Sequence, residues 1–256
     1  MRKRAVMAAV VGTLSAFAVP SGAQADGHEG DTQIIKVVIN DGHEIALGTT
    51  KEKKFTLKVT ASDDSGIKEH FTVPSLWNGS KGRVTPDDGS GDCVPHADAP
   101  TISTCIYHMT LRPRIDPQDN TTAGTWKADV PISGNDGDYM DNDTAATVKV
   151  RRYAKMTVNA SPEPVKRGKS LTVTGELTRA SWETYRYAGY SGQKVKLQFR
   201  KKGTTAYTTV KTVTTGSGGA LKTTVKAATD GHWRWSFAGT STTHSITTTA
   251  DYVDVG

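Results

Sequence analysis

Apolar side chains in this chain recur at every second position over short segments, and this alternation restricts the fold more than any other feature. A period of two is typical of a half-buried β-strand, and no long segment shows the period of an amphipathic helix. The alternating segments are 34–40, 54–61, 67–73, 105–111, 125–132, 146–152, 170–177, 194–201 and 232–239. We therefore predict an all-β protein.

Charge divides the chain into two parts. Residues 26–150 have a net charge of −8, and residues 151–256 have a net charge of +11. A reversal of sign at one point indicates two units with different surfaces. Short strands with turn signals between them favour β-sandwiches of the immunoglobulin-like (Ig-like) type, with a barrel as the alternative. We predict two tandem Ig-like domains, an acidic one over 26–152 and a basic one over 153–256. No Gly/Ser-rich or Pro-rich spacer separates them, so the pair should be stiff.

The first 25 residues read as a secretory signal. "MRKR" is basic, the apolar run that follows is too short for a comfortable membrane span, and "AQA" at 23–25 fits the small-x-small cleavage rule. We predict cleavage after Ala25, so that Asp26 begins a secreted, extracellular chain. No later apolar run reaches the length of a membrane span.

The chain has two cysteines, Cys93 and Cys105. In an exported protein they are expected to form a disulfide. "CVPH" and "CIYH" also give Cys-x2-His twice, which is a zinc-like spacing. Alternation in the strand 105–111 places His108 on the face opposite Cys105, which disfavours a shared zinc ion. The disulfide is the preferred prediction.

Acidic side chains gather in two predicted loops. The segment 136–143 has no basic residue, and the turn "SDDSG" lies after the strand 54–61. If 54–61, 67–73, 125–132 and 146–152 are strands B, C, F and G, the B–C and F–G loops lie at the same end of the sandwich. Six carboxylates would then share one tip: Asp63, Asp64, Asp136, Asp138, Asp141 and Asp143.

Close carboxylates repel one another, and a cation removes that cost. Calcium takes six to eight oxygen ligands from carboxylates, amides and backbone carbonyls. We therefore predict Ca²⁺ as the cofactor, with Asp63, Asp64, Asp136 and Asp138 as the first ligands and Asp141 and Asp143 as alternates. The spacing is not an EF-hand loop, and a solvated turn is the alternative.

The predicted basic domain offers two further surfaces. Its strands place lysines and arginines outward, which either protects the sheet edges or attracts an anionic cell-wall polymer such as a teichoic acid. A loop at 179–192 carries four aromatic residues: Trp182, Tyr185, Tyr187 and Tyr190. These could bind the sugar rings of a polysaccharide, or pack at the junction with the first domain. Junction packing is the preferred interpretation, since a short linker needs an apolar interface to stay rigid.

"DDSGI" and, far downstream, "GTWKADVPISGNDGD" resemble a pattern found in bacterial Ig-like domains. The second half, from "MTVNASPEPVKRGKSLTVTGEL" through "DGHWRWSFAGTSTT", is similar to the Ig-like domain of secreted proteins of Gram-positive soil bacteria. Proteins of this kind are often labelled calcium-binding proteins. The resemblance covers nearly all of the predicted mature chain and implies the Ig-like fold strongly and calcium binding weakly.

No catalytic pattern is present. The chain lacks a G-x-S-x-G nucleophile elbow, a P-loop and a dinucleotide fingerprint, and "HEIAL" at 43–47 has Leu47 where a zinc protease requires a second histidine. We predict a secreted, non-enzymatic, calcium-binding Ig-like protein, an extracellular interaction or structural module. The alternative is a metal-independent cell-wall or carbohydrate-binding adhesion protein. We expect no nucleic-acid partner and no membrane span, and the sequence names no protein partner.

Overall fold

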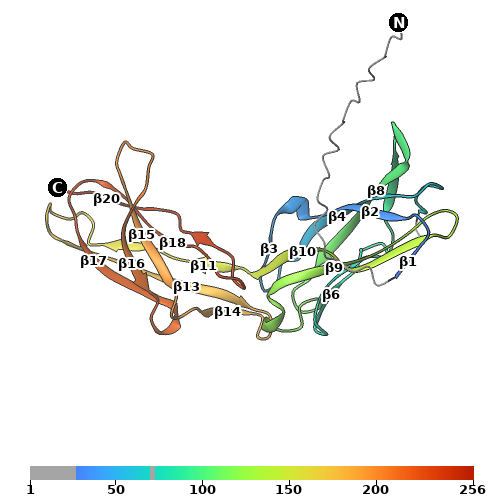
Figure 1. The fold of residues 1–256 in the computed structure, drawn as a ribbon. Coiled ribbons are helices and arrows are strands. Elements are labelled where there is room, and N and C mark those ends of the chain that lie inside the picture. The colour runs from blue at the N-terminus through green and yellow to red at the C-terminus, as the bar shows by residue number, and fades with distance from the viewer. Residues whose placement is uncertain (1–26, 70–72) are drawn as a thin grey trace, which may run out of the picture.

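The computed structural model describes residues 27–69 and 73–256. The predicted signal segment 1–25, its neighbour Asp26 and part of the predicted strand 67–73 lie outside the described residues. The described chain is built almost wholly of strands, which form two β-sandwiches joined end to end (Figure 1). None of the described helices is long and apolar enough to span a bilayer.

The first sandwich has the strand order of an Ig-like domain. One sheet runs β2 (Gln33–Ile39), β4 (Lys53–Ser62), β8 (Ala99–Leu111), β7 (Asp92–His96). The other runs β1 (Gly27–Glu29), β10 (Tyr139–Arg152), β9 (Gly124–Ser133), β5 (Ser75–Asn78), β6 (Gly82–Val84), and β3 (Ile45–Leu47) lies parallel to β10. With β2, β4 and β8 as strands A, B and E, the sheets read A-B-E-D and G-F-C, which is the Ig-like arrangement.

The second sandwich is built around the long strand β13 (Ser170–Ser181). Four short strands pair with it: β11 (Ala154–Met156), β12 (Asn159–Ser161), β14 (Arg186–Gly189) and β17 (Ala220–Lys226). The facing sheet consists of β16 (Thr208–Thr214), β15 (Lys194–Lys201), β18 (Gly231–Phe237), β19 (Ile246–Thr247) and β20 (Asp251–Val253). Three 3-10 turns complete the chain: η1 (Asn40–Gly42), η2 (Asn120–Thr122) and η3 (Ser217–Gly219).

The alternating apolar residues form two separate cores, as the pattern predicts. Phe55, Leu57, Val59 and Ala61 of β4 are buried in the first core, and Trp126, Ala128, Val130 and Ile132 of β9 face them. The second core holds Val195, Leu197, Trp233, Trp235 and Phe237. The chain passes from the sheet of β10 to the sheet of β11 at Tyr153, and the boundary between 152 and 153 remains a prediction.

Two predicted strand positions are wrong. Strand C is β5, at 75–78; of the predicted segment 67–73, the described residues 67–69 and 73 lie in no strand, and Ile67 makes an isolated bridge to Gly134. Pro74, which has no N–H for a ladder, lies between the two segments. Strand G begins at Tyr139 and not at 146, since a register shift between Asn142 and Ala146 breaks the alternation that would have revealed its first half.

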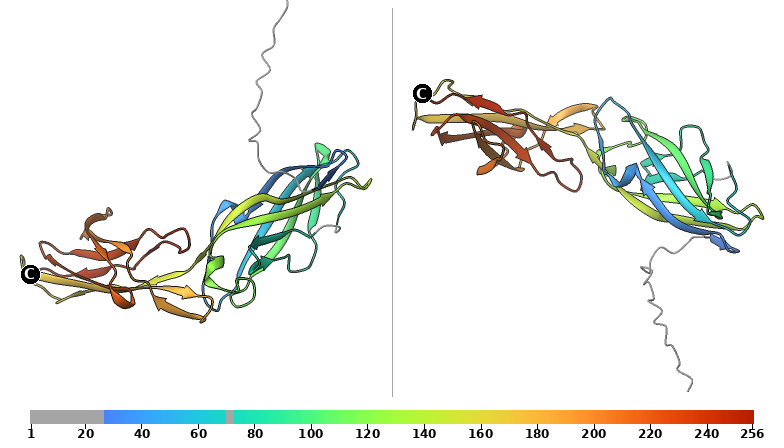
Figure 2. Two further views of the ribbon diagram at one scale, coloured as in Figure 1. Left: turned by 60° about the horizontal axis from the view of Figure 1, so that its bottom comes forward. Right: turned by 90° about the horizontal axis from the view of Figure 1, so that it is seen from above.

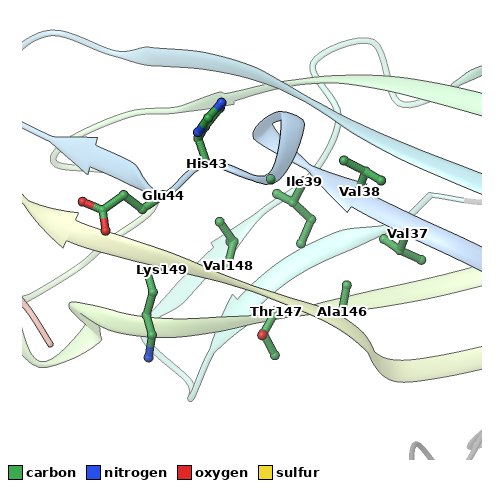
Figure 3. A pocket seen from close by; sticks show the side chains of 10 residues that line it. Val37, Val38, Ile39, His43, Glu44, Ala146, Thr147, Val148 and Lys149 are labelled. Atoms are coloured by element: carbon green, nitrogen blue, oxygen red, sulfur yellow. The ribbon is translucent and has the colours of Figure 1, made fainter. Parts of the chain in front are cut away.

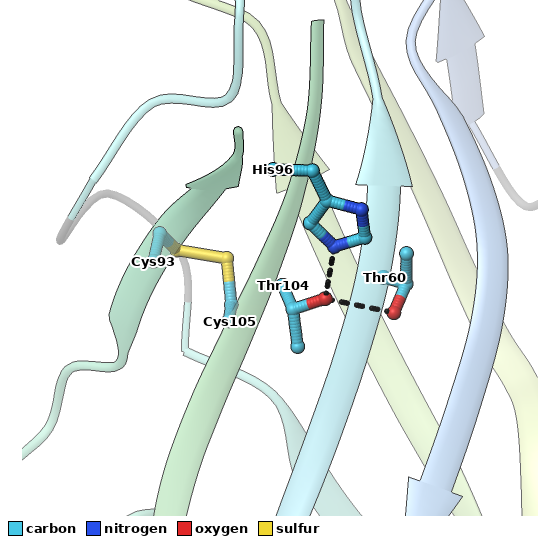
Figure 4. The surroundings of a disulfide bond; sticks show 5 residues. All are labelled: Thr60, Cys93, His96, Thr104 and Cys105. Carbon is cyan, nitrogen blue, oxygen red and sulfur yellow. Dashed lines mark hydrogen bonds between the residues drawn. A yellow bond between two sulfur atoms is a disulfide. The ribbon is translucent and has the colours of Figure 1, made fainter. Parts of the chain in front are cut away.

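Cys93 and Cys105 are cross-strand partners on β7 and β8 and form the predicted disulfide (Figure 4). Both sulfur atoms are therefore used, and neither "CVPH" nor "CIYH" can supply a zinc thiolate. His96 instead makes a hydrogen bond with the Thr104 hydroxyl at 2.9 Å, which in turn contacts Thr60 at 3.1 Å. His108 lies exposed on the opposite face of β8, as predicted.

Replacement of Cys93 and Cys105 by alanine should lower the free energy of unfolding by at most about 3 kcal/mol, because the bond closes a short loop. The sequence separation of the two cysteines is 12. Urea unfolding of the variant and of reduced wild type should give the same loss. A loss in the variant alone would show that side-chain packing, and not the cross-link, is responsible.

Trp182 joins the two sandwiches. It lies between β13 and β14 of the second sandwich, yet its side chain is fully buried among core residues of the first. Its indole Nε1 donates to the carbonyl oxygens of Gly48 at 3.1 Å and Leu47 at 3.4 Å, and its backbone N donates to Asn120 Oδ1 at 2.9 Å. The structure thus places this residue at the junction, where it completes the first core.

Backbone hydrogen bonds add to this junction. Tyr153 N donates to Leu47 O at 2.8 Å, and Tyr153 O accepts from Ala180 N at 2.9 Å. The buried Arg152 donates from Nε to Ala180 O at 2.5 Å, and its pKa falls to about 10, mainly through burial and then through repulsion by Arg179. These contacts hold the sandwiches as one elongated body, which two further views also show (Figure 2).

Trp182→Ala should destabilise the first sandwich by about 3–5 kcal/mol, since it leaves a large cavity in that core. Tyr185→Ala, a change to a half-exposed ring on the same loop, serves as the control. Only for Trp182→Ala should thermal unfolding show a transition at lower temperature and small-angle scattering of the folded protein show a more flexible pair of sandwiches. Equal transitions for the two variants would contradict the role assigned to Trp182.

Candidate metal site

Three acidic loops meet at the end of the first sandwich that faces away from the second. The loops are 30–32 between β1 and β2, 63–66 after β4, and 134–138 between β9 and β10. In Figure 1 the turn between β9 and β10 lies at the far end of the molecule from the C-terminus. The B–C and F–G loops of the prediction are therefore two of the three, and the loop at 30–32 is the one that sequence reasoning missed.

The carboxylates form two groups that share Asp63. Ligand atoms of Asp31, Asp63 and Asp64 all lie within 4.8 Å of one another. Those of Asp63, Asp136 and Asp138 do so as well. The structure thus brings together the four residues predicted as first ligands and adds Asp31 to them. Oxygen atoms at these separations are able to share a calcium ion, whose ligand distances are about 2.3–2.6 Å.

Asp63 is the fixed centre of both groups, with an exposed fraction of only 2%. Its Oδ2 accepts from the Thr32 hydroxyl at 2.5 Å, and its Oδ1 accepts from Ser65 N at 2.9 Å and Ser65 Oγ at 2.5 Å. Burial raises the pKa of Asp63, but the hydrogen bonds from Ser65 and Thr32 outweigh it and leave the pKa below its ordinary value. Asp63 is therefore held ionised.

Asp64 has the opposite electrostatic environment. Repulsion from Asp31 is the largest cause that raises its pKa, followed by burial and by repulsion from Asp136. One carboxylate joins two of the loops, since Asp31 N donates to Asp138 Oδ2 at 2.9 Å, and within the loop 134–138 Asp138 N donates to Asp136 Oδ1 at 3.1 Å. Negative charge is thus concentrated by the fold and is destabilising at Asp64.

Two glycines allow the loops to approach so closely. A Cβ atom at Gly134 would lie 2.2 Å from an Asp63 carboxylate oxygen, and one at Gly30 would lie 1.5 Å from Asp138 Oδ2. Gly30 also has a φ of +76°, a conformation that side-chain-bearing residues rarely adopt. The tip therefore needs glycine at both positions to bring its carboxylates together.

Asp141 and Asp143, the alternates of the prediction, belong to neither group. Both lie on β10, which begins earlier than the sequence pattern suggests. Asp143 Oδ1 accepts from the Thr144 hydroxyl at 2.5 Å, and its backbone oxygen accepts from Trp77 Nε1 at 3.0 Å. Asp141 pairs with Pro131, and Asp143 lies in the register shift between Asn142 and Ala146. Since β10 begins at Tyr139, the tip turn is confined to 134–138.

The aromatic loop of the second sandwich is engaged in internal contacts. Trp182 is fully buried, which corrects its place among the possible ligand-binding aromatics. Cations lie over the rings of the other three: Arg114 over Tyr185 at 4.6 Å, Lys155 over Tyr187 at 3.8 Å and Arg179 over Tyr190 at 3.8 Å. Burial raises the pKa of Tyr187. These cation–π contacts occupy ring faces on which a sugar would stack.

Neither a protein-family model nor a curated protein sequence matches this chain. Among solved structures, the chain is similar to the D00-D0 domain of Intimin, with 14% identity, 85% of this chain and 99% of that chain covered, and a TM-score of 0.28. A chimeric titin Z1Z2 gives 8% identity, coverage of 92% and 99%, and a TM-score of 0.26. Tandem Ig repeats of Dlar give 9% identity, coverage of 90% of this chain and 99% of that chain, and a TM-score of 0.22. The Ig-like assignment rests on the strand order described above.

Asp64→Asn should stabilise the protein in EDTA near pH 7, since the raised pKa makes ionised Asp64 destabilising above that pKa. The effect should vanish as the pH falls through the raised pKa toward 3.8, where wild-type Asp64 is also neutral. Asp63 acts in the opposite sense, because its lowered pKa stabilises the fold above 3.8 and this contribution is lost only at lower pH. Thermal melts from about pH 7 to about pH 4 measure the Asp64 trend, and melts continued to about pH 2 measure the Asp63 trend. A variant no more stable than wild type at pH 7 would contradict the repulsion.

Proposed function

We propose that the protein is a secreted, non-enzymatic Ig-like interaction module that binds calcium at its distal tip. One observation carries the proposal: three loops, 30–32, 63–66 and 134–138, supply five aspartates and no lysine or arginine. Asp63 belongs to two groups in which the ligand atoms all lie within 4.8 Å of one another. Asp31 and Asp64 complete one group, and Asp136 and Asp138 complete the other. No basic side chain within these loops offsets the charge.

Calcium suits this geometry better than a smaller cation. It accepts six to eight oxygen ligands in a flexible arrangement, whereas Mg²⁺ demands near-ideal octahedral geometry and dehydrates reluctantly. Asp63 would be the shared ligand, since its carboxylate is already fixed by Thr32 and Ser65. A bound ion would offset the repulsion that raises the pKa of Asp64. Extracellular modules of this type bind calcium with a Kd of about 0.1–1 mM.

The position of the tip indicates what the ion would do. The three loops are the free end of an elongated molecule whose other end is the second sandwich (Figure 2). Binding would fix the loops relative to one another and present a rigid surface to a protein or a cell-wall polymer. Loops on a rigid Ig-like scaffold commonly serve as recognition surfaces, which supports an interaction role.

The proposal of a non-enzymatic role takes account of a groove in the first sandwich. A groove of about 530 Å³ lies between β2 and β10, and valine and alanine side chains line much of it (Figure 3). Glu44, at one end, pairs with Arg151 at 2.9 Å and contacts His244. Among the described residues this groove joins no nucleophile to a base in the way that covalent catalysis requires. Secretion is supported by the N-terminal pattern and by the Cys93–Cys105 disulfide.

Thermal melts of the chain 26–256 in EDTA, in about 10 mM Ca²⁺ and in about 10 mM Mg²⁺ test the proposal. Calcium at about 10–100 times its Kd should add about 1.4–2.7 kcal/mol to the stability of the first sandwich, and magnesium much less. Asp64→Asn combined with Asp136→Asn removes one exposed ligand from each group and should abolish the shift.

Asp88→Asn combined with Asp254→Asn is the matched control, because it removes the same charge from two exposed sites outside the tip. The control should keep the full calcium shift. Identical melting curves in EDTA and in calcium would contradict calcium binding and favour a solvated turn at the tip. Retention on chitin, cellulose or cell walls in EDTA would then favour the metal-independent adhesion alternative.

A further inference from the structure

In the described part of the chain, the outer face of the sheet β16–β15–β18 concentrates positive charge, and its lysines and arginines make no ion pair with a carboxylate. These three strands contain six lysines and arginines, one histidine and no aspartate or glutamate. The outward positions of β15 are Lys194, Lys196, Gln198 and Arg200, since Val195 and Leu197 point into the core. Across from them on β18, Arg234 opposes Gln198 and His232 opposes Arg200.

Tyr207 holds two guanidinium groups side by side on this face. The Arg234 guanidinium carbon lies 3.5 Å from the centre of the Tyr207 ring, and that of Arg200 lies 5.3 Å from it. Two neighbouring guanidiniums repel each other, and cation–π attraction to the Tyr207 ring offsets part of this cost. Tyr207 therefore fixes a pair of cations that would otherwise move apart.

Each guanidinium is also oriented by one hydrogen bond. Arg234 Nε donates to Gln198 Oε1 at 2.8 Å, and Arg200 Nη1 donates to the backbone oxygen of Thr204 at 2.7 Å. Both acceptors are neutral. Because a guanidinium has five N–H groups, most donors of this pair remain for a ligand.

In contrast, three arginines of the first sandwich each pair with a carboxylate. Arg83 pairs with Asp129 at 3.3 Å, Arg112 with Asp87 at 2.9 Å and Arg151 with Glu44 at 2.9 Å. Within the described part of the chain, Arg200 and Arg234 have no such carboxylate. The nearest acidic position at the sheet end, Asp230, pairs with Lys202 at 3.3 Å. These three arginines of the first sandwich are thus paired with carboxylates, whereas Arg200 and Arg234 are not.

We propose that this face, defined by Lys194, Lys196, Arg200 and Arg234 with Tyr207 as the orienting ring, binds an anionic polysaccharide that carries phosphate or sulfate groups. Oriented guanidiniums recognise such oxyanions through paired, charge-assisted hydrogen bonds. Successive outward residues of a strand are about 6.7 Å apart, so the cations form a row suited to a chain with repeating charges. The surface lies on the second sandwich and is independent of the calcium site.

The same geometry disfavours single-stranded nucleic acid. Such ligands bind by stacking bases on free aromatic faces. Here the Arg234 guanidinium covers a face of Tyr207, and His232 lies against Tyr252 with ring centres 5.1 Å apart. The rings orient charges and side chains and do not form a stacking platform.

Binding of the chain 26–256 to immobilised heparin, a sulfated polysaccharide, tests the proposal at about 0.15 M salt. EDTA is present throughout, so that the result does not depend on the calcium site. Arg200→Gln with Arg234→Gln should weaken binding about 100-fold, since each charge-assisted contact is worth roughly tenfold in affinity. Arg200→Lys with Arg234→Lys keeps the charge but loses the paired donors, and it should weaken binding about tenfold.

Lys222→Gln with Lys226→Gln is the matched control, because it removes two charges from exposed positions on β17 of the opposite sheet. The control should bind within about twofold of wild type, a change well below one charge-assisted contact. Inorganic polyphosphate should compete with heparin if phosphate groups are accepted, and neutral dextran should not. The proposal would be overturned if the two double Gln variants lost the same heparin affinity. Binding to dextran, or tighter binding to single-stranded DNA than to heparin, would also overturn it.

Discussion

The burial of Trp182 in the core of the first sandwich is the contact on which the overall architecture depends. An indole from the second sandwich is buried in the core cluster of the first, and its N–H donates to the carbonyl oxygens of Leu47 and Gly48 at the end of β3. A side chain shared in this way makes the two sandwiches energetically dependent on each other, because separation would expose a large aromatic surface and leave a cavity. Arg152 and Tyr153 add hydrogen bonds around it. The acidic tip is consequently held at a fixed distance from the basic face.

The two proposed binding surfaces bring together side chains of like charge, negative at the tip and positive on the second sandwich. At the tip, carboxylates from three loops approach one another around Asp63, and repulsion raises the pKa of Asp64. On the outer face of β15 and β18, guanidiniums approach one another around Tyr207. Both arrangements carry an electrostatic cost that a ligand of opposite charge would offset, a small cation in one case and an anionic chain in the other. Their separation on one rigid body would let a calcium-dependent contact and a charge-dependent contact operate at once.

Much of the fold could be predicted from the sequence because strand alternation is a local property. The buried faces of β4, β9 and β18 follow directly from apolar residues at every second position. The disulfide was predictable since two cysteines leave one pairing. Strand C and the start of strand G were not, because strand C lies at 75–78, beyond the predicted segment, and the register shift after Asn142 hides the alternation. Asp141 and Asp143 were expected in a turn and lie instead on β10, whose start the sequence pattern does not reveal.

By itself the sequence determined the period of two, the reversal of charge between the halves, and the loops in which Asp63, Asp64, Asp136 and Asp138 would lie. Only the tertiary structure decided that Asp31 joins them, because that contact depends on β1 pairing with β10 and on glycine at 30 and 134. It also decided that Trp182 is a core residue and that Arg200 and Arg234 meet over Tyr207. Alternation shows which face a side chain takes, whereas these contacts depend on how strands and loops distant in the chain are brought together.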